Sequence, residues 1–345
     1  MRIAIIITLC FFYSIISCTK EEKENYPLDV SIPSNFPPIV YNLESNPVTK
    51  YGFELGKKLF YDGKLAADNI VSCGFCHEQS YAFTHHGHNI SLGVFDNAGM
   101  RNAQPIQNMA FQKEFMWDGA ALHLDLQPII PLTSDLEMGE TIGNVIQKLK
   151  ADKTYPSDFS KAFKDGEINS ENLFKALSQF MVMMVSGNSK YDKILRKEEG
   201  YQWSDEEKSG YQVFQNKCSE CHTGTLQTDE TYRNNGLPIN PKYNDEGRSK
   251  VTGLETDKFK FKVPSLRNIE HTAPYMHDGR FTSLESVLNF YANGVTHTSN
   301  LDPILIKNNH ELGISLSESE KLEIIAFLKT LSDPTFLNDK RFSEY

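Results

Sequence analysis

Two copies of one short cysteine motif constrain the fold of this 345-residue chain more than any other feature. Residues 73–77 read Cys-Gly-Phe-Cys-His, and residues 218–222 read Cys-Ser-Glu-Cys-His. The pattern is typical of c-type haem attachment, in which two thioethers tether the porphyrin and the following histidine binds the iron. The sequence therefore predicts two covalent c-type haems as cofactors. The residues predicted to hold them are Cys73, Cys76 and His77 for the first haem, and Cys218, Cys221 and His222 for the second.

A zinc site and a redox-active dithiol are the two alternatives for such cysteines. Structural zinc sites use four-cysteine or two-cysteine, two-histidine sets without a histidine directly after the second cysteine. A redox dithiol is expected in a βαβ setting, which this sequence lacks. The two pentapeptides therefore favour haem over both alternatives.

The N-terminus has the layout of an export signal. Arg2 is followed by an apolar run through Ile16, too short for the roughly 20 residues of a membrane-spanning helix. Residues 15–18, Ile-Ile-Ser-Cys, resemble the lipobox of bacterial lipoproteins, in which the cysteine is lipidated. The sequence predicts a signal peptide over residues 1–17, which removes Cys10, and an exported, periplasmic protein anchored at Cys18. A coincidental cysteine beside an ordinary cleavage site is the alternative.

The net charge of −10 limits the kinds of partner. Binding to nucleic acid or to an anionic membrane surface requires clustered lysine and arginine, which this chain lacks. We therefore expect no nucleic-acid partner and a membrane contact through the lipid anchor only. Redox partners are expected to be basic or neutral proteins.

An internal repeat precedes the two motifs. A glycine followed three and four residues later by two apolar residues occurs in residues 51–60 and again in residues 208–214. This spacing puts the apolar pair on one face of a short helix leading to each haem. The matched residues are Gly56, Leu59 and Phe60 in the first copy and Gly210, Val213 and Phe214 in the second.

A closing helix is expected after each haem motif. Residues 173–185 are strongly apolar, and residues 322–331 repeat apolar side chains at helical spacing before Asp333 and Pro334. The predicted fold class is mainly α, with two cytochrome c-like domains that each carry one covalent haem. The predicted boundaries are an extended tether over 18–45, an N-terminal domain over 46–195 and a C-terminal domain over 200–345. The charged stretch 190–203 is predicted to be the linker.

Five further segments, taken in order with the haem motifs, resemble the bacterial di-haem cytochrome c peroxidase and MauG family over nearly all of the mature chain. The resemblance implies that a haem in the N-terminal domain reacts with hydrogen peroxide and that a haem in the C-terminal domain handles electrons. The segments are Gly99–Asn102, Phe115–Gly119, Asp135–Met138, Val263–Asn268 and Thr272–Gly279.

The resemblance also assigns residues around the first haem. His77 is implied as the proximal ligand and Glu137 as the distal acid/base that peroxide cleavage needs. Gln127 and Pro131 are implied to line the same pocket, and Trp117 to lie between the two haems, where an indole shortens the path of an electron. Without the resemblance, Glu137 reads as a solvated glutamate and Trp117 as a packed core residue.

The sequence departs from the family pattern where peroxidases carry a histidine that caps the first haem. Eight residues before Asn102 stands Val94. His85, His86 and His88 lie nearby. Two interpretations have equal weight: one of these histidines is an irregular cap, or all three lie in a polar, solvated loop. We expect a first haem that is open as isolated and needs no reductive activation.

The distal ligand of the second haem has two candidates. Met276 is the choice by analogy with ordinary cytochromes, because thioether ligation raises the reduction potential. Family spacing instead points to Tyr291, seventeen residues after Pro274, where peroxidases have methionine and MauG-like members tyrosine. A phenolate lowers the potential and stabilises ferric iron. Tyr291 is preferred, with an aromatic core residue on a helix as the competing interpretation.

The resemblance finally implies a calcium ion between the haems. Its ligands would be the side chain of Asn102 and the main-chain carbonyls of Thr272 and Pro274, an all-oxygen set that suits a hard cation.

The expected activity is that of a di-haem peroxidase. It would reduce hydrogen peroxide with electrons from a periplasmic donor, or oxidise residues of a protein substrate in MauG-like fashion. The alternative is a non-catalytic di-haem electron-transfer cytochrome, which would need two six-coordinate haems and no acid/base residue.

Overall fold

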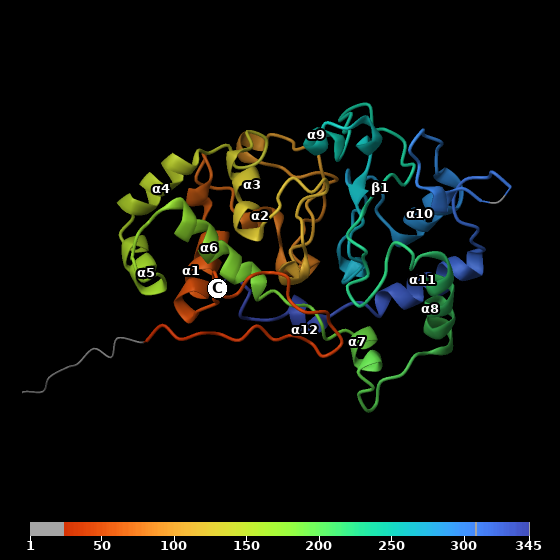
Figure 1. Ribbon diagram of the computed structural model, residues 1–345, viewed down its shortest axis with the longest axis horizontal. Helices are drawn as coiled ribbons and strands as arrows, with labels where there is room; N and C mark the ends of the chain where they lie inside the picture. The colour runs from red at the N-terminus through yellow and green to blue at the C-terminus, as the bar shows by residue number, and fades with distance from the viewer. Residues whose placement is uncertain (1–23, 308, 345) are drawn as a thin grey trace, which may run out of the picture.

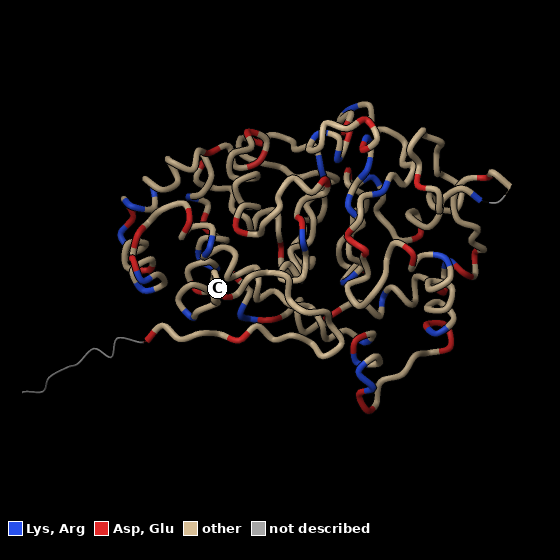
Figure 2. Tube along the Cα trace, viewed as in Figure 1, with Lys and Arg blue, Asp and Glu red and all other residues tan. Residues whose placement is uncertain are grey.

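The computed structural model describes residues 24–307 and 309–344 of the chain, so the predicted signal peptide and Cys18 lie outside the described residues. The protein is mainly helical and has two halves that lie side by side (Figure 1). Acidic and basic residues are interspersed along both halves (Figure 2), as the modest net charge predicts. None of the helices in this part of the chain is long and apolar enough to span a bilayer.

The first half contains six helices between the N-terminal segment and the connection to the second half. The first haem motif forms the short helix α2, and α1 and α6 are the longest helices that surround it. The bounds are α1 Lys50–Tyr61, α2 Cys73–Cys76, α3 Ile129–Thr133, α4 Ile142–Ala151, α5 Tyr155–Ala162 and α6 Ser170–Val182.

The second half follows α7 and contains the elements from α8 to α11, after which α12 returns to the first half. Its strands, β1 and β2, form a two-stranded antiparallel ladder in which Tyr232 is opposite Lys262. Helix α10 continues directly into a π-helical turn, η8. The bounds are α7 Lys190–Leu195, α8 Asp205–Lys217, β1 Tyr232–Arg233, α9 Ser249–Thr252, β2 Phe261–Lys262, α10 Leu284–Asn289, η8 Phe290–Gly294, α11 Glu318–Lys329 and α12 Pro334–Leu337.

The repeat read from the sequence is a repeated helix crossing. A Cβ atom at Gly56 of α1 would lie 1.9 Å from the carbonyl oxygen of Ala176 in α6. In the second half, a Cβ atom at Gly210 of α8 would lie 1.8 Å from the carbonyl oxygen of Glu323 in α11. Only glycine permits this approach, because any side chain would overlap the facing backbone. The predicted helices leading to each haem and closing each half are therefore confirmed.

The first half has one apolar core and the second half has two clusters, and some residues pack in the core of the half that lies farther from them along the chain. Phe336 and Phe342, near the C-terminus, pack in the core of the first half. Tyr191, at the start of the connection, packs in the core of the second half with Phe214 and Phe327. The chain therefore crosses between the halves twice, once through α7 and once on the way to α12.

The segment 190–203, predicted to be the linker, lies between the two halves and is partly helical. It begins with α7, which is capped by Ser189. Asp192 on this helix is fully buried and forms an ion pair with Arg267 at 2.7 Å. This part of the linker is therefore fixed to the second half by a buried partner distant in sequence.

The described part of the predicted tether, residues 24–45, is extended as expected, but it is packed along the protein and not free (Figure 1). Leu28 and Val30 contact the core of the first half. Further along, Asn35 donates to the carboxylate of Asp192 at 2.8 Å, and the Phe36 ring lies 4.5 Å from the guanidinium of Arg267. The segment therefore spans both halves.

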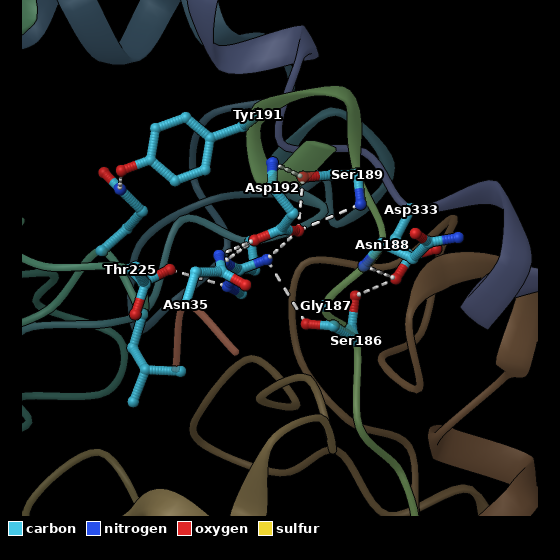
Figure 3. Close-up of polar contacts among 12 residues, drawn as sticks. Asn35, Ser186, Gly187, Asn188, Ser189, Tyr191, Asp192, Thr225 and Asp333 are labelled. Carbon is cyan, nitrogen blue, oxygen red and sulfur yellow. Dashed lines mark hydrogen bonds and ion pairs between the residues drawn. The ribbon is translucent and has the colours of Figure 1, made fainter. Parts of the chain in front are cut away.

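A buried polar cluster joins this segment to α7 and to the loop after the second haem motif (Figure 3). Arg267 donates to both carboxylate oxygens of Asp192 and, through Nε, to the carbonyl of Thr225 at 2.8 Å. Ser189 also donates to Asp192, at 2.7 Å. Both oxygens of the Asp192 carboxylate therefore accept hydrogen bonds, which is what a buried charge requires.

We predict that Asp192→Asn destabilises the protein by about 3–5 kcal/mol, because it leaves a buried guanidinium without its counter-charge. The free energy of unfolding of the haem-loaded protein would be measured by urea titration. Glu171→Gln is the control, since the Glu171–Lys175 pair is exposed and worth less than about 1 kcal/mol. Equal losses in the two variants would contradict the assignment.

Candidate functional site

Each haem motif borders a large, mostly apolar cavity. The first cavity encloses about 1180 Å³ of empty space, partly open to solvent, and is lined by Cys73, Cys76 and His77. The second encloses about 1610 Å³ and is lined by Cys218, Cys221 and His222. The rest of each wall is largely aliphatic and aromatic, as a flat apolar cofactor requires.

The two histidines have the orientation of iron ligands. Nδ1 of His77 lies 2.7 Å from the carbonyl of Phe83, and Nδ1 of His222 lies 3.2 Å from the carbonyl of Gln227. Since a carbonyl only accepts, each Nδ1 carries the proton and donates, which leaves the lone pair on Nε2 for a metal. Burial lowers the pKa of both imidazoles, so the neutral, ligating form is favoured.

The cysteines fit attachment of a haem better than the alternative sites. None of the four forms a disulfide. Burial raises the pKa of Cys73 and Cys218 to about 12, the opposite of the lowered pKa that activates a redox dithiol. The described residues also contain no cluster of three or more His, Cys, Asp or Glu side chains that would hold a zinc ion. The residues therefore fit two covalent haems.

Glu137 borders the first cavity, together with His77 from α2. The loop that carries it is fixed by its backbone: Glu137 N donates to Ser134 O at 3.0 Å, and Val94 N donates to Glu137 O at 2.7 Å. Burial raises the pKa of the Glu137 carboxyl, and the positive charge of Arg101 opposes the increase. The loop thus presents to the cavity a carboxyl group that holds its proton more readily than an exposed glutamate.

Gln127 and Pro131 line the same cavity, from the residues just before α3 and from α3 itself. The side-chain amide of Gln127 donates to the sulfur of Met116 at 3.5 Å. Met116 also lines the cavity and has a positive φ of 73°. The sequence reading did not assign Met116, although it lies within the quoted Phe115–Gly119 segment.

Trp117 lines both cavities, which is true of few residues in the described chain. Its indole nitrogen donates to the carbonyl of Asn102 at 2.9 Å, and its own carbonyl accepts from Lys262 N at 2.7 Å. One contact is to the first half and the other is to β2 of the second half. The indole is therefore held at the junction of the two halves.

The three histidines considered as caps do not line the first cavity. His86 is exposed, stacks on Tyr81 and lies 3.0 Å from Glu78. His85 is buried, and burial lowers its pKa to about 4. Val94, at the position of the usual cap, is buried. Among the described residues, His77 is therefore the histidine that borders this cavity.

Tyr291 and Met276 both line the second cavity, so each is placed to be considered as a ligand. Tyr291 belongs to η8 and not to a regular α-helix, and its carbonyl accepts from Ile314 N at 2.7 Å. Burial raises the pKa of the Tyr291 phenol, and a hydrogen bond from Asn235 opposes the increase. Asn235 was missed by the sequence reading, and no local signal marks it.

The residues of the expected calcium site lie together at the wall of the second cavity. Nδ2 of Asn102 lies 3.0 Å from the carbonyl oxygen of Pro274, and Thr272 and Pro274 are both buried. The site would need the amide oxygen of Asn102 to face the cation. Here the amide nitrogen faces Pro274, so the arrangement brings the residues together without itself indicating an ion.

Arg101 forms a charged network that sequence reasoning also missed. It donates to Asp118 at 2.7 Å and to Asp245 at 2.6 Å, and Lys250 lies 3.0 Å from Asp245. Asp118 belongs to the first half and Asp245 to the second. The network therefore ties the halves together beside the first cavity, where Arg101 also acts on Glu137.

We predict that the double substitution of Cys218→Ala and Cys221→Ala reduces the covalent haem content from two to one per chain, because each motif serves its own cavity. The denatured protein would be weighed by mass spectrometry after expression with haem maturation. The equivalent change at Cys73 and Cys76 is the reciprocal control. Two covalent haems in either double variant would contradict the assignment.

Comparison with known proteins adds an independent finding. A family model described as di-haem cytochrome c peroxidase matches residues 50–200. The chain is 33% identical to the methylamine utilization protein MauG of Methylorubrum extorquens, over 86% of this chain and 82% of that protein. It is also 33% identical to the cytochrome c551 peroxidase of Nitrosomonas europaea, over 81% of this chain and 79% of that protein.

A solved structure of a MauG-like protein associated with microbial copper homeostasis has a similar architecture. It superposes with a TM-score of 0.81 at 30% identity, covering 92% of this chain and 99% of that chain. Together with the observed helices, this likeness confirms the predicted fold class, mainly α with two cytochrome c-like domains.

Proposed function

The chain belongs to the di-haem cytochrome c peroxidase and MauG family, and from this premise we propose that it reduces hydrogen peroxide at its first cavity. The electrons come from a periplasmic donor or from residues of a protein substrate. The observation that carries the proposal is the presence of Glu137 in the wall of the cavity that contains His77, with Trp117 bordering both cavities. Two c-type haems follow from the family, and the cysteines and histidines described above would hold them.

A haem held by His77 would supply the redox-active iron for the reduction of peroxide. The residues of the chain supply the proton. Glu137 accepts the proton of the incoming peroxide in its ionised form and returns it to the oxygen that leaves as water. A carboxyl with a raised pKa suits both steps, because it holds the proton long enough to deliver it. Gln127 and Pro131 complete the wall on this side and limit the space for water.

Trp117 connects the cavities electronically. An aromatic side chain held by hydrogen bonds between two redox centres shortens the distance that an electron must cross. Its contacts with Asn102 and Lys262 fix the indole at this point. Electrons that enter through the second half therefore have a route to the first cavity.

Tyr291 is proposed as the distal ligand of the second haem. A phenolate ligand stabilises the oxidised iron, which suits an enzyme that draws electrons from amino-acid side chains. The proposal for Asn102, Thr272 and Pro274 is a calcium ion that stiffens the junction beside Trp117. Export and a lipid anchor at Cys18 remain proposals from the sequence, and both are compatible with c-type haem maturation outside the cytoplasm.

We predict that Glu137→Gln lowers kcat for peroxide by at least about 100-fold, since positioned acid–base groups contribute roughly 10²–10⁴. Turnover would be followed with a reduced small c-type cytochrome as the donor. Asp135→Asn, on the same loop and exposed, is the control and is expected to keep its activity. Activity that survives Glu137→Gln would remove the assigned role.

The pH profile gives a second readout of the same variant. The base form of Glu137 is lost as the pH falls through its raised pKa, so kcat/KM should decline on the acid side at a higher pH than an exposed glutamate would give. This decline on the acid side should be absent from the pH profile of Glu137→Gln.

The alternative function, a non-catalytic electron carrier, predicts a different result. Such a protein would show no change in either Soret band when peroxide is added.

We predict that Trp117→Phe slows oxidation of the second haem by peroxide while leaving the reaction at the first haem unchanged. Stopped-flow spectra of the fully reduced protein would separate the two rates. Trp203→Phe is the matched control, because Trp203 stacks on Tyr211 within the second half and lines neither cavity. Equal rates in the two variants would exclude Trp117 from the electron path.

A further inference from the structure

Three side chains converge on one wall of the second cavity. Nδ2 of Asn235 lies 3.3 Å from the phenolic oxygen of Tyr291 and 3.8 Å from the sulfur of Met276. All three line the cavity that also contains His222. One amide group therefore contacts both candidates for the distal ligand.

The orientation of the Asn235 amide is fixed by its backbone. Its oxygen accepts from Leu237 N at 3.2 Å, so its nitrogen faces Tyr291, and a flipped amide would lose the contact with Leu237 N. The neighbouring Asn234 is buried and donates to Thr298 and Asn300 at 2.9 and 2.8 Å. The loop is therefore rigid on the side that meets the phenol.

The tyrosine is equally constrained. It lies in the π-helical turn η8, and turns of this kind occur frequently at functional sites. Because Tyr291 O accepts from Ile314 N, the turn is tied to the loop that precedes α11. A Cβ atom at Gly313 would lie 2.5 Å from this carbonyl, and Gly313 has a positive φ of 86°. Packing around η8 therefore holds the Tyr291 phenol next to the Asn235 amide.

We infer that Asn235 is a positioning residue for the second haem, which it influences by donating a hydrogen bond to the Tyr291 oxygen. This inference rests on Tyr291 being the distal ligand, as proposed above. A hydrogen bond to an anionic ligand draws electron density from it and weakens its donation to the iron. The amide therefore keeps the reduction potential of the second haem above the value that an unassisted phenolate would give.

The test replaces Asn235 with leucine, which has a similar size and no donor, in the haem-loaded protein. The midpoint potential of each haem would be measured by spectroelectrochemical titration. We expect the midpoint potential of the second haem to fall by about 59 mV. For a one-electron couple, this is roughly a tenfold change in the oxidised-to-reduced ratio at fixed potential. The first midpoint should not change.

Asn240→Leu is the matched control. The Asn240 side chain accepts from Lys242 N, two residues on, and donates to Asp278, so it makes the same two kinds of contact without touching Tyr291. Asn235→Ser retains an acceptor for Leu237 N but is too short to reach the phenol. If Asn235→Leu does not fold, Asn235→Ser should show the same decrease in the midpoint potential of the second haem.

Two outcomes would overturn the inference. One is an unchanged second midpoint in both Asn235 variants. The other is a rise that Met276→Leu abolishes, which would mean that the sulfur has replaced the phenol.

The Tyr291→Phe background separates this inference from the proposal beneath it. If Tyr291→Phe changes the second haem and Asn235→Leu has no further effect in that background, the amide acts through the tyrosine. If Tyr291→Phe leaves the spectrum and midpoint of the second haem unchanged, the ligand assignment fails, and the role of Asn235 fails with it.

Discussion

Each half of this protein must enclose a large flat cofactor that is tied to one short segment, and this constraint decides where its helices touch. The apolar core of each half must therefore leave room for a large cavity beside the haem motif. In each half, one crossing brings two helices into close backbone contact. There Gly56 meets Ala176, and Gly210 meets the backbone of Glu323. The same solution in both halves explains the repeat in the sequence.

The relation between the halves depends on buried polar contacts. Arg267 pairs with Asp192 under the N-terminal segment, while Arg101 pairs with an aspartate from each half. These contacts have directional geometry, so they fix the orientation of the halves as well as their proximity. Trp117 lies at this junction. The proposed electron path therefore crosses the part of the molecule where the two halves are most firmly oriented.

Much of the fold was predictable because its signals are local. The helices around Gly56 and Gly210 follow from apolar spacing, and the two attachment sites follow from five-residue motifs. The charged stretch 190–203 was predicted as the linker, but its contact with Arg267 was not predictable, because the partner of Asp192 is 75 residues away. The return of Phe336 and Phe342 to the first core likewise has no local signal. A family resemblance supplied Glu137 and Tyr291, which residue patterns alone would have left as a surface glutamate and a core aromatic.

The sequence by itself predicted two haems and the side chains that would attach them, because thioether bonds and the adjacent histidine need only consecutive residues. It also determined the helix pairs, since helical periodicity is a property of one segment. Only the tertiary structure decided which distant groups share a cavity. Trp117 at the junction of both cavities and Asn235 beside Tyr291 are results of packing between segments far apart in the chain. The hydrogen-bond donors and acceptors around a cofactor come from segments far apart in the chain, so no single stretch of sequence predicts that they are in contact.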